Sequence, residues 1–291
     1  MCKSFYCIYR CSSSNATHLT PHFPFQKNTS KSKFMKSLKQ LDGHKIKFVF
    51  TDIDDTLTNN GLLESVAFSA IWRLYRAGIH VIPVTGRPAG WCELIARQWP
   101  VKAVIGENGG FYFYYEQKKM QRCFVFDSTQ RDSHRTKLDT IKNEILNRVH
   151  GADVASDQFC RLMDLAIDFC EDVKPLSAEQ IQEIVDIFKA HGAQAKVSSI
   201  HVNGWFGEYD KLSMCKKFCQ DVLKFDLAHA QNQVLFVGDS PNDEPMFSFF
   251  ENSVGVANVN DFHLKFPPKY VTKKLRGEGF KELTDHILGP A

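Results

Sequence analysis

Apolar positions along the chain follow two spacings that alternate from Lys45 onward. Short unbroken apolar runs predict buried strands, and apolar residues three and four positions apart predict helices that bury one face. The expected strands and helices of this first stretch are, in order, 46–51, 62–76, 79–85, 91–98 and 101–105. Gly78, after the first helix, is a favourable helix stop. Strands that alternate with helices predict a parallel sheet with right-handed crossovers.

The alternation is interrupted after Gly110 and returns after Tyr209. The interruption is expected to contain the strands 111–115 and 123–126 around a turn at Gln117-Lys118-Lys119, the helix 131–149, the strand 162–169, the helix 177–191 and the strand 194–202. Ser177 and Gln180 have the spacing of a capping box. The later elements are the helices 211–223 and 244–250 and the strands 234–237, 254–257 and 270–271. This pattern predicts an α/β fold whose parallel-sheet core is interrupted by a smaller α+β insertion.

These boundaries divide the chain into a leader at 1–44, a core at 45–127 and 205–291, and the insertion at 128–204. The leader has no Asp or Glu before Asp42 and is rich in Ser, Thr, Asn and Lys, so it predicts disorder. Such a leader is typical of an organelle transit peptide; a plain tail and an over-long reading frame with its true start at Met35 are the alternatives. No apolar h-region follows the basic residues, which excludes a secretory signal.

Composition narrows the class of protein. The chain has 291 residues and is 43% hydrophobic, which is enough for a packed core. Its net charge of +3 is too small to indicate nucleic-acid binding, and no apolar stretch is long enough to cross a membrane. The nine cysteines have neither zinc spacing nor the pattern of a disulfide framework. We therefore expect a cytoplasmic protein with reduced thiols, or an organellar one if the leader is a transit peptide.

Three carboxylates stand where the first expected strand ends. From Phe48 to Leu57 the chain reads FVFTDIDDTL, which places Asp52, Asp54 and Asp55 after a run of strand-forming residues. Ionised carboxylates repel one another and are costly to bury unpaired, so this arrangement predicts a bound cation. Along an extended strand Asp52 and Asp54 share one side, while Asp55 alternates away. A turn with a helix cap is the alternative use of such residues.

Further polar groups follow later strands of the expected sheet. Thr85-Gly86-Arg87 follows the second strand, and Gly238-Asp239-Ser240-Pro241-Asn242-Asp243 follows a later one. Lys211 stands at the start of the helix after the insertion. Open α/β sheets bind ligands at the carboxyl ends of their strands, so we expect these groups to lie together. Their oxygen ligands suit Mg²⁺, and the lysine, the hydroxyl and free backbone N–H groups suit a phosphoryl group.

In this order Asp-x-Asp-Asp-Thr, Thr-Gly-Arg, an isolated Lys and Gly-Asp-Ser-x-Asn-Asp resemble the motifs of the haloacid dehalogenase (HAD) superfamily of phosphohydrolases. The insertion between the second and third motifs, and the turn at 107–110, resemble the type IIB branch of Cof-like and sugar-phosphate phosphatases. The resemblance spans about 45–288. It implies a Rossmann-like parallel-sheet core with an inserted α+β cap domain of type C2B. It also implies a Mg²⁺-dependent phosphatase that acts on a small phosphorylated metabolite, such as a sugar phosphate.

The resemblance carries roles onto matching positions. It implies that Asp52 is the nucleophile that forms an aspartyl-phosphate and that Asp54 is the general acid and base. Asp55 is expected to be structural. The implied metal ligands are Asp52, Asp54 through its backbone carbonyl, and Asp239. Asp243 is either a further ligand or the residue that orients Lys211 or a metal-bound water. The implied contacts to substrate are Thr85, Gly86, Arg87, Asn108, Lys211 and Asn242. Lys216 and Lys217 are rivals of Lys211, and a surface ion pair is the alternative for Arg87.

In this architecture the cap covers the site and selects the leaving group. Its candidate contacts, each with a structural role as the alternative, are Arg161, Asp164, His201 and Asn203. Two other functions stay open: a phosphomutase that uses the same Asp52 and Asp54, and a non-catalytic sugar-phosphate sensor. We expect a small-molecule phosphorylated substrate and neither a nucleic-acid nor a membrane partner; the sequence indicates no oligomeric state.

Overall fold

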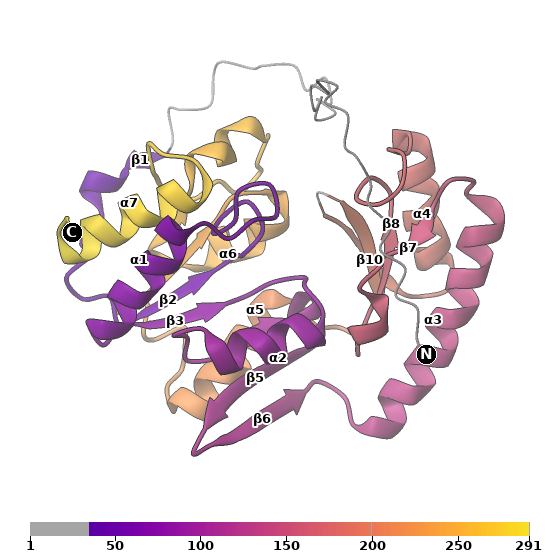
Figure 1. Cartoon of the computed structure of the whole chain (residues 1–291), viewed down its shortest axis with the longest axis horizontal. Helices are drawn as coiled ribbons and strands as arrows, with labels where there is room; N and C mark the ends of the chain where they lie inside the picture. Colours follow the sequence, from indigo (N-terminus) through magenta and orange to yellow (C-terminus); the bar gives the residue numbers. More distant parts are fainter. Residues whose placement is uncertain (1–34, 199, 291) are drawn as a thin grey trace, which may run out of the picture.

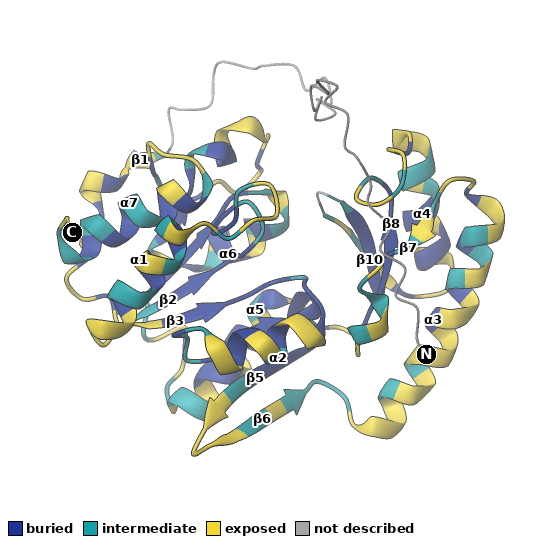
Figure 2. Ribbon diagram, in the orientation of Figure 1, coloured by how far each residue is buried: buried dark blue, intermediate teal, exposed yellow. Residues whose placement is uncertain are grey.

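The computed structural model describes residues 35–198 and 200–290. Most of the expected leader, and with it the predictions of disorder and of a transit peptide, lies outside the described residues. Two layered units are visible in Figure 1, and Figure 2 shows that each has a buried interior. Within the described part of the chain, no helix combines the length and the apolar character that crossing a bilayer needs.

A parallel sheet forms the larger unit, as the alternation of strands and helices predicts. Its strand order is β1-β13-β12-β11-β2-β3, and every neighbouring pair is parallel. The strands are β1 (Lys36–Ser37), β2 (Phe48–Thr51), β3 (His80–Pro83), β11 (Val234–Gly238), β12 (Ser253–Gly255) and β13 (Tyr270–Val271). Because β2 and β11 are neighbours inside the sheet, the residues that follow them emerge side by side at one edge.

Helices cover both faces of this sheet (Figure 1). They are α1 (Ser65–Arg76), α2 (Ala89–Gln98), α5 (Lys211–Phe218), α6 (Glu244–Phe249) and α7 (Arg276–Leu288). Val49 of β2 lies in one apolar cluster with residues of α1, α2 and α7, and its neighbour Phe50 lies in another with residues of α5 and α6. Successive side chains of a strand point to opposite faces, so a strand buried on both sides reads as an unbroken apolar run.

A hairpin extends the core at one edge. The strands β4 (Val104–Gly106), β5 (Phe111–Glu116) and β6 (Lys119–Phe124) pair antiparallel, and a parallel bridge between Val84 and Ile105 joins them to the rest of the core. Gln117 and Lys118 both have positive φ, 50° and 61°, as a two-residue hairpin turn requires. The hairpin predicted around these residues is confirmed.

The smaller unit is the inserted cap, an antiparallel sheet with helices on one face (Figure 1). Its strand order is β7-β8-β10-β9, from β7 (Asp153–Val154), β8 (Leu165–Asp168), β9 (Gln194–Val197) and β10 (His201–Trp205). The helices are α3 (Ser128–Arg148) and α4 (Ala178–Ala190), and the predicted capping box of Ser177 and Gln180 starts α4. One apolar cluster joins both helices to β8 and β10. The α/β class with an inserted α+β cap is thus confirmed.

The expected leader boundary at His44 is wrong for the described residues before it. β1 pairs with β13 at the edge of the core sheet, and Leu38 and Leu41 are buried in the core cluster. A strand of two residues has no period that a sequence pattern can detect. The folded part of the chain therefore begins ahead of Lys45.

The insertion and the C-terminal part also differ from the prediction. The stretch 194–202 is two strands, because Ser198 Oγ accepts hydrogen bonds from the N–H groups of Ile200 and His201 and the chain turns back. The helix expected over 211–223 is present as α5, which continues directly into a π-helix over Cys219–Leu223. The sequence analysis did not predict β7 or α7.

Candidate active site

The carboxyl ends of β2 and β11 bring two acids together. Asp52 directly follows β2, and its N–H donates to the carbonyl of Val237 in β11 at 2.9 Å. Asp239 follows β11, and its N–H donates to Asp243 Oδ2 at 3.2 Å, which turns the carboxylate of Asp243 back toward the sheet. Oxygens of Asp52, Asp239 and Asp243 lie within 4.8 Å of one another, and all three residues are buried.

Lys211 is the cation of this cluster. It is the first residue of α5, which Asp210 and Ser213 start with a capping box. Its Nζ donates to Asp52 Oδ1 at 2.8 Å and to Asp243 Oδ1 at 2.9 Å, and the residue is 4% exposed. The structure thus brings together the lysine and three of the acids that the sequence analysis selected.

The two rival lysines lie elsewhere. Lys217 pairs with Asp221, and Lys216 lies over the ring of Phe249. The turn at Gly109 lies close to the backbone of Asp210, the residue before Lys211. A Cβ on Gly109, whose φ is 103°, would lie 2.1 Å from the carbonyl oxygen of Asp210. Only glycine fits at this point of the turn that follows β4.

Burial and like charge shift the protonation of this cluster. Burial raises the pKa of Asp52 to about 7, although Lys211 acts to lower it. Burial, reinforced by Asp243 and Asp52, raises the pKa of Asp239 well above its usual range. Burial alone would lower the pKa of Lys211, but Asp243 and Asp52 outweigh it and the pKa is raised. One lysine does not balance three buried carboxylates, so the cluster favours a further cation.

The donor set fits Mg²⁺. Asp239 is held from both sides, because its Oδ1 accepts from Thr56 Oγ1 and its Oδ2 from Asn258 Nδ2, each at 3.1 Å. Fixed carboxylate oxygens are the ligands that Mg²⁺ prefers. The sequence analysis missed Asn258, which lies in a single-turn helix with no motif of its own. The carboxylate of Asp54 is not part of the acidic cluster.

Asp54 is held by Arg87 instead. Arg87 Nε lies 3.1 and 3.0 Å from the two oxygens of Asp54, and Nη2 lies 2.8 Å from Oδ1. The guanidinium lies 4.6 Å above the ring of Trp91, and Arg87 is buried. Burial alone would lower the pKa of Arg87, but Asp54 outweighs it and the pKa is raised. Arg87 therefore forms an ion pair, but a buried one and not the surface pair expected as its alternative, and its partner is the expected general acid Asp54.

The loop after β3 places the other expected phosphoryl contacts. Thr85 is buried, and its Oγ1 accepts from the N–H of Arg87 at 3.0 Å. Asn108 donates its N–H to the carbonyl of Thr85 at 3.1 Å and has a left-handed backbone with φ 56°. Within the described residues its Nδ2 has no hydrogen-bond partner. A Cβ on Gly86 would come within 3.3 Å of the Asn108 amide, so the two loops are in close contact.

Asp55 turns away from this site. Its φ is 55°, and its Oδ1 lies 3.0 Å from Nε of Arg276 at the start of α7. The carbonyl of Asp55 accepts from Asn258 Nδ2 at 3.0 Å. These contacts tie the end of β2 to the C-terminal helix, which is the kind of contact that a structural role requires.

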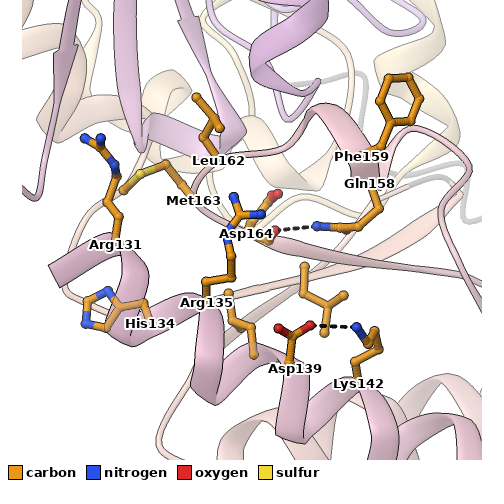
Figure 3. A pocket seen from close by; sticks show the side chains of 12 residues that line it. Arg131, His134, Arg135, Asp139, Lys142, Gln158, Phe159, Leu162, Met163 and Asp164 are labelled. Carbon is orange, nitrogen blue, oxygen red and sulfur yellow. Dashed lines mark hydrogen bonds and ion pairs between the residues drawn. The ribbon is translucent and has the colours of Figure 1, made fainter. Parts of the chain in front are cut away.

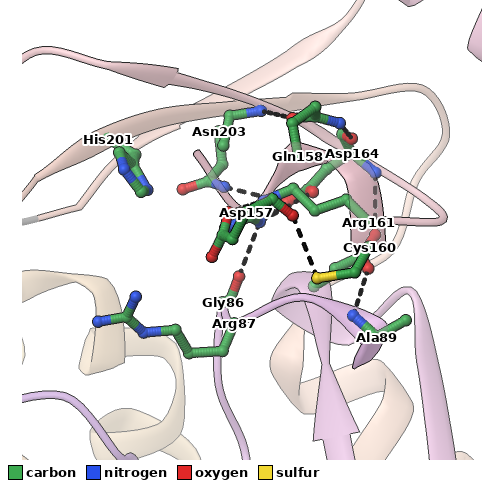
Figure 4. A network of polar contacts seen from close by, with 12 residues as sticks. Gly86, Arg87, Ala89, Asp157, Gln158, Cys160, Arg161, Asp164, His201 and Asn203 are labelled. Atoms are coloured by element: carbon green, nitrogen blue, oxygen red, sulfur yellow. Dashed lines mark hydrogen bonds and ion pairs between the residues drawn. The ribbon is translucent and has the colours of Figure 1, made fainter. Parts of the chain in front are cut away.

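The cap presents a buried polar network to the loop after β3 (Figure 4). Arg161 donates to Asp157 and to Asp164 Oδ1, each at 3.0 Å, and to the carbonyl of Gly86 at 3.1 Å. Asn203 Nδ2 donates to Asp164 Oδ2 at 3.1 Å. The structure therefore gathers three of the expected cap residues in one place. Carboxylates of the cap itself already neutralise Arg161.

Glu107 joins the cap to the core, and the sequence analysis gave it no role. Its carboxylate accepts the N–H groups of Ala89 at 2.9 Å, of Leu162 at 2.9 Å and of Asp164 at 3.1 Å, together with that of Met163. Burial and Asp164 act to raise its pKa, and the backbone N–H groups oppose this. A fully buried side chain of the core thus anchors three consecutive residues of the cap.

His201 lies on the same side of the cap. Its Nε2 is 2.9 Å from Glu171, whose other oxygen is 3.8 Å from Arg87. Asp168 shapes the loop that carries Glu171, because its carboxylate accepts the N–H groups of residues 170 to 172. Burial and Arg161 lower the pKa of His201 to about 4, so the ring is neutral at physiological pH.

Lys196 of β9 is a further cap residue that the sequence analysis missed. Its Nζ donates to the backbone carbonyl of Asn242 at 2.7 Å, and Asn242 lies in the loop between Asp239 and Asp243. Burial and the charge of Lys211 lower the pKa of Lys196 to about 8. The side chain of Asn242 accepts from Ser240 Oγ at 3.2 Å.

A separate cavity of about 240 Å³ lies between α3 and the segment that leads into β8 (Figure 3). Its lining residues are Arg131, His134, Arg135, Leu138, Asp139, Lys142, Gln158, Phe159, Leu162, Met163, Asp164 and Leu165. Gln158 and Asp164 also belong to the polar network of Figure 4. None of the acids after β2 and β11 lines this cavity.

Comparison with known proteins gives a family and a set of relatives. Residues 49–146 match the family described as haloacid dehalogenase-like hydrolase. A phosphoglycolate phosphatase of Methanobrevibacter smithii is 27% identical over 245 residues, which cover 82% of this chain and 97% of that protein. A phosphoglycolate phosphatase of Nitrosopumilus maritimus is 24% identical over 245 residues, 81% of this chain and 94% of its own.

Solved structures share the fold at lower identity. A protein of Thermoplasma acidophilum superposes with a TM-score of 0.67 at 19% identity and covers 84% of this chain and 99% of its own. The sucrose-phosphatase of Synechocystis, solved with sucrose and phosphate, has a TM-score of 0.58 at 16% identity, with 84% and 98% covered. The arrangement of core and cap is therefore common to this chain and these proteins.

Proposed function

We propose that this chain is a phosphoric monoester hydrolase of the haloacid dehalogenase superfamily, which hydrolyses a small phosphorylated metabolite through an aspartyl-phosphate on Asp52 with Mg²⁺ as its cofactor. One observation carries the proposal. Lys211 bridges Asp52 and Asp243 at 2.8 and 2.9 Å, and Asp239 lies in the same buried cluster. Phosphoryl transfer through a covalent intermediate needs a nucleophilic carboxylate held beside a lysine and a cation site.

In the first step a carboxylate oxygen of Asp52 attacks the phosphorus atom. A bond forms between that oxygen and phosphorus, and the bond from phosphorus to the oxygen of the leaving group breaks. The carboxylic acid of Asp54 gives its proton to this leaving oxygen, which departs as an alcohol. Lys211 and the hydroxyl of Thr85 hold the phosphoryl oxygens while charge is redistributed.

In the second step a water molecule attacks the phosphorus atom of the aspartyl-phosphate. Asp54, now ionised, takes a proton from this water, and the bond from phosphorus to Asp52 breaks. Inorganic phosphate leaves, and both acids return to their starting state. Arg87, which grips both oxygens of Asp54, keeps this carboxylate oriented near the reacting atoms.

Mg²⁺ would be held by Asp52, Asp239, the backbone carbonyl of Asp54 and, directly or through water, Asp243. When bound, it supplies positive charge that offsets the carboxylates and the phosphoryl group. Thr56 and Asn258 support this assignment, because they orient Asp239 from outside the cluster.

A sugar phosphate is the substrate class that the sequence resemblance favours. The names of the relatives widen the choice, since two of them are phosphoglycolate phosphatases. The polar groups that the cap turns toward the core, Arg161, Asn203 and His201, suit a small oxygen-rich leaving group.

The test is an assay of inorganic phosphate release by the purified chain on a panel of phosphorylated metabolites. We expect turnover with Mg²⁺, loss of turnover with a chelator, and no need for a bisphosphate activator. Rapid quenching followed by mass spectrometry should find the phosphoryl group on the peptide that contains Asp52. Absence of phosphate release across the panel, or a strict requirement for a bisphosphate, would contradict the proposal.

A further inference from the structure

The sheet of the cap has two chemically different faces. Val202, Leu165 and Ile167 belong to the apolar cluster with α3 and α4. His201 and Asn203 alternate with Val202 along β10, so they lie on the opposite face. Lys196 pairs directly with Asn203 across the antiparallel β9–β10 ladder, and directly opposite residues share a face. The face away from the cap helices therefore carries a lysine, an amide and an imidazole.

This polar face is turned toward the catalytic acids. Lys196 reaches the carbonyl of Asn242 at 2.7 Å, in the loop that holds Asp239 and Asp243. Asp243 and Asp52 lie near enough for their charges to act on the Lys196 ammonium. The cap thus places Lys196 against the loop that carries Asp239 and Asp243.

The charge of Lys196 is not neutralised by carboxylates in the way that the charges of Arg161 and Arg87 are. Arg161 has Asp157 and Asp164 as partners, and Arg87 has Asp54 and Glu171. In the described ranges, the Lys196 ammonium forms no ion pair at contact distance, and its hydrogen bond goes to a neutral carbonyl. An ammonium group has three donors, so two are left for a ligand.

We infer that Lys196 binds a carboxylate on the leaving group, so that this enzyme selects small phosphomonoesters with a carboxylate close to the ester oxygen. This inference rests on the proposed phosphatase function. The phosphoryl group has Lys211 and Thr85 from the core, whereas Lys196 comes from the cap, which lies over the leaving group. A neutral leaving group would bury the charge of Lys196 without a counter-charge, which disfavours such substrates.

The test compares two substrates of nearly equal size, 2-phosphoglycolate and 2-hydroxyethyl phosphate, which differ by a carboxylate in place of a hydroxymethyl group. We expect the native enzyme to prefer 2-phosphoglycolate in kcat/KM. Lys196→Met keeps the length of the side chain and removes its charge. It should raise KM for 2-phosphoglycolate by about 10- to 100-fold, the size of one charge-assisted hydrogen bond, with kcat little changed. The same variant should leave KM for 2-hydroxyethyl phosphate within about threefold.

Two further variants sharpen the test. Lys196→Arg should restore part of the preference, because arginine also binds carboxylates. Lys189→Met, on the exposed side of α4, is the matched control and should change neither substrate. If Lys196→Met does not fold, by circular dichroism, Lys196→Gln replaces it in the same comparison.

The outcomes separate this inference from the proposed function. Equal losses on both substrates, a fall confined to kcat, or a native preference for 2-hydroxyethyl phosphate would overturn the assignment of Lys196 and leave the phosphatase mechanism standing. Lack of turnover on either substrate and on every other phosphomonoester would instead remove the proposed function itself.

Discussion

The edge of the core sheet and the polar face of the cap differ in how far their charges are balanced. At the core edge three buried carboxylates share a single lysine, and the pKa values of Asp52 and Asp239 are raised. On the cap Arg161 already has two acids of its own, and His201 is neutral. The core therefore needs a ligand to balance its charge, whereas most of the cap network is complete without one.

This difference gives the two regions different roles: the core edge binds charged groups, and the cap fixes the shape of the site. An unbalanced cluster binds a cation and a phosphoryl group because both lower its energy. A balanced network does not attract ions, but it fixes where its side chains stand and which groups of a substrate fit between them. Lys196 is the exception on the cap side, since its charge faces the core without a carboxylate in contact.

The largest effect is expected at the nucleophile. Asp52→Asn should lower kcat by at least about 1,000-fold, because an amide does not form the aspartyl-phosphate and loss of a covalent nucleophile costs this much or more. Phosphate release on the best substrate of the panel measures the change. Asp55→Asn is the matched control: its carboxylate lies against Arg276, and we expect kcat to stay within about tenfold.

Circular dichroism and thermal unfolding should show that both variants fold. If the Asp52→Asn variant folds and keeps more than a few per cent of native turnover, the covalent mechanism is wrong. If Asp55→Asn were as inactive as Asp52→Asn, the division between a reacting and a structural acid would be wrong.

Much of the core site could be predicted because its residues stand next to strands that a pattern reveals. Asp52, Asp54, Thr85 and Asp239 each follow an apolar run, and the carboxyl ends of neighbouring parallel strands meet. Asn258 could not be found in this way, since a short 3₁₀ helix without a detectable period brings it to Asp239.

The cap and the C-terminal helix were less predictable for physical reasons. Lys196 faces the site only because the chain turns near Ser198, and a shift of one residue in the β9–β10 register would point it the other way. Glu107 has a left-handed backbone, with φ 43°, that its sequence does not reveal. α7 contains Gly277 and Gly279, which weaken a helical pattern, yet tight packing against Leu57 and Lys274 requires them.

The second largest effect is expected at Glu107, where the core contacts the cap. Glu107→Ala should lower the free energy of unfolding by about 3 kcal/mol, because four backbone N–H groups lose their acceptor in a buried place. Urea unfolding measures the change. Glu93→Ala on α2 is the control: Glu93 also has several hydrogen bonds, but its partners Arg97 and Arg122 lie at the surface, and we expect a loss below about 1 kcal/mol.

Equal losses for Glu107→Ala and Glu93→Ala would show that the anchor between core and cap is no stronger than a surface ion pair. Limited proteolysis adds a second readout. The Glu107 variant should be cut faster near residues 158–164, where its N–H partners lie, and the Glu93 variant should not be.

The smallest effect concerns the protonation of Asp52 and depends on the metal. The pKa of Asp52 is about 7 in the fold against an ordinary 3.8, so between these values the folded chain binds more protons than the unfolded chain. Without metal, this contribution to the free energy of unfolding is fully present below the lower value and is lost as pH rises through about 7. Mg²⁺ binds the ionised form, so it should stabilise the chain by about 2 kcal/mol more at pH 8 than at pH 5.5. Thermal unfolding with and without Mg²⁺ at both pH values measures this difference. Asp52→Asn should shrink it, and equal stabilisation of the native chain at the two pH values would mean that Asp52 is not a ligand.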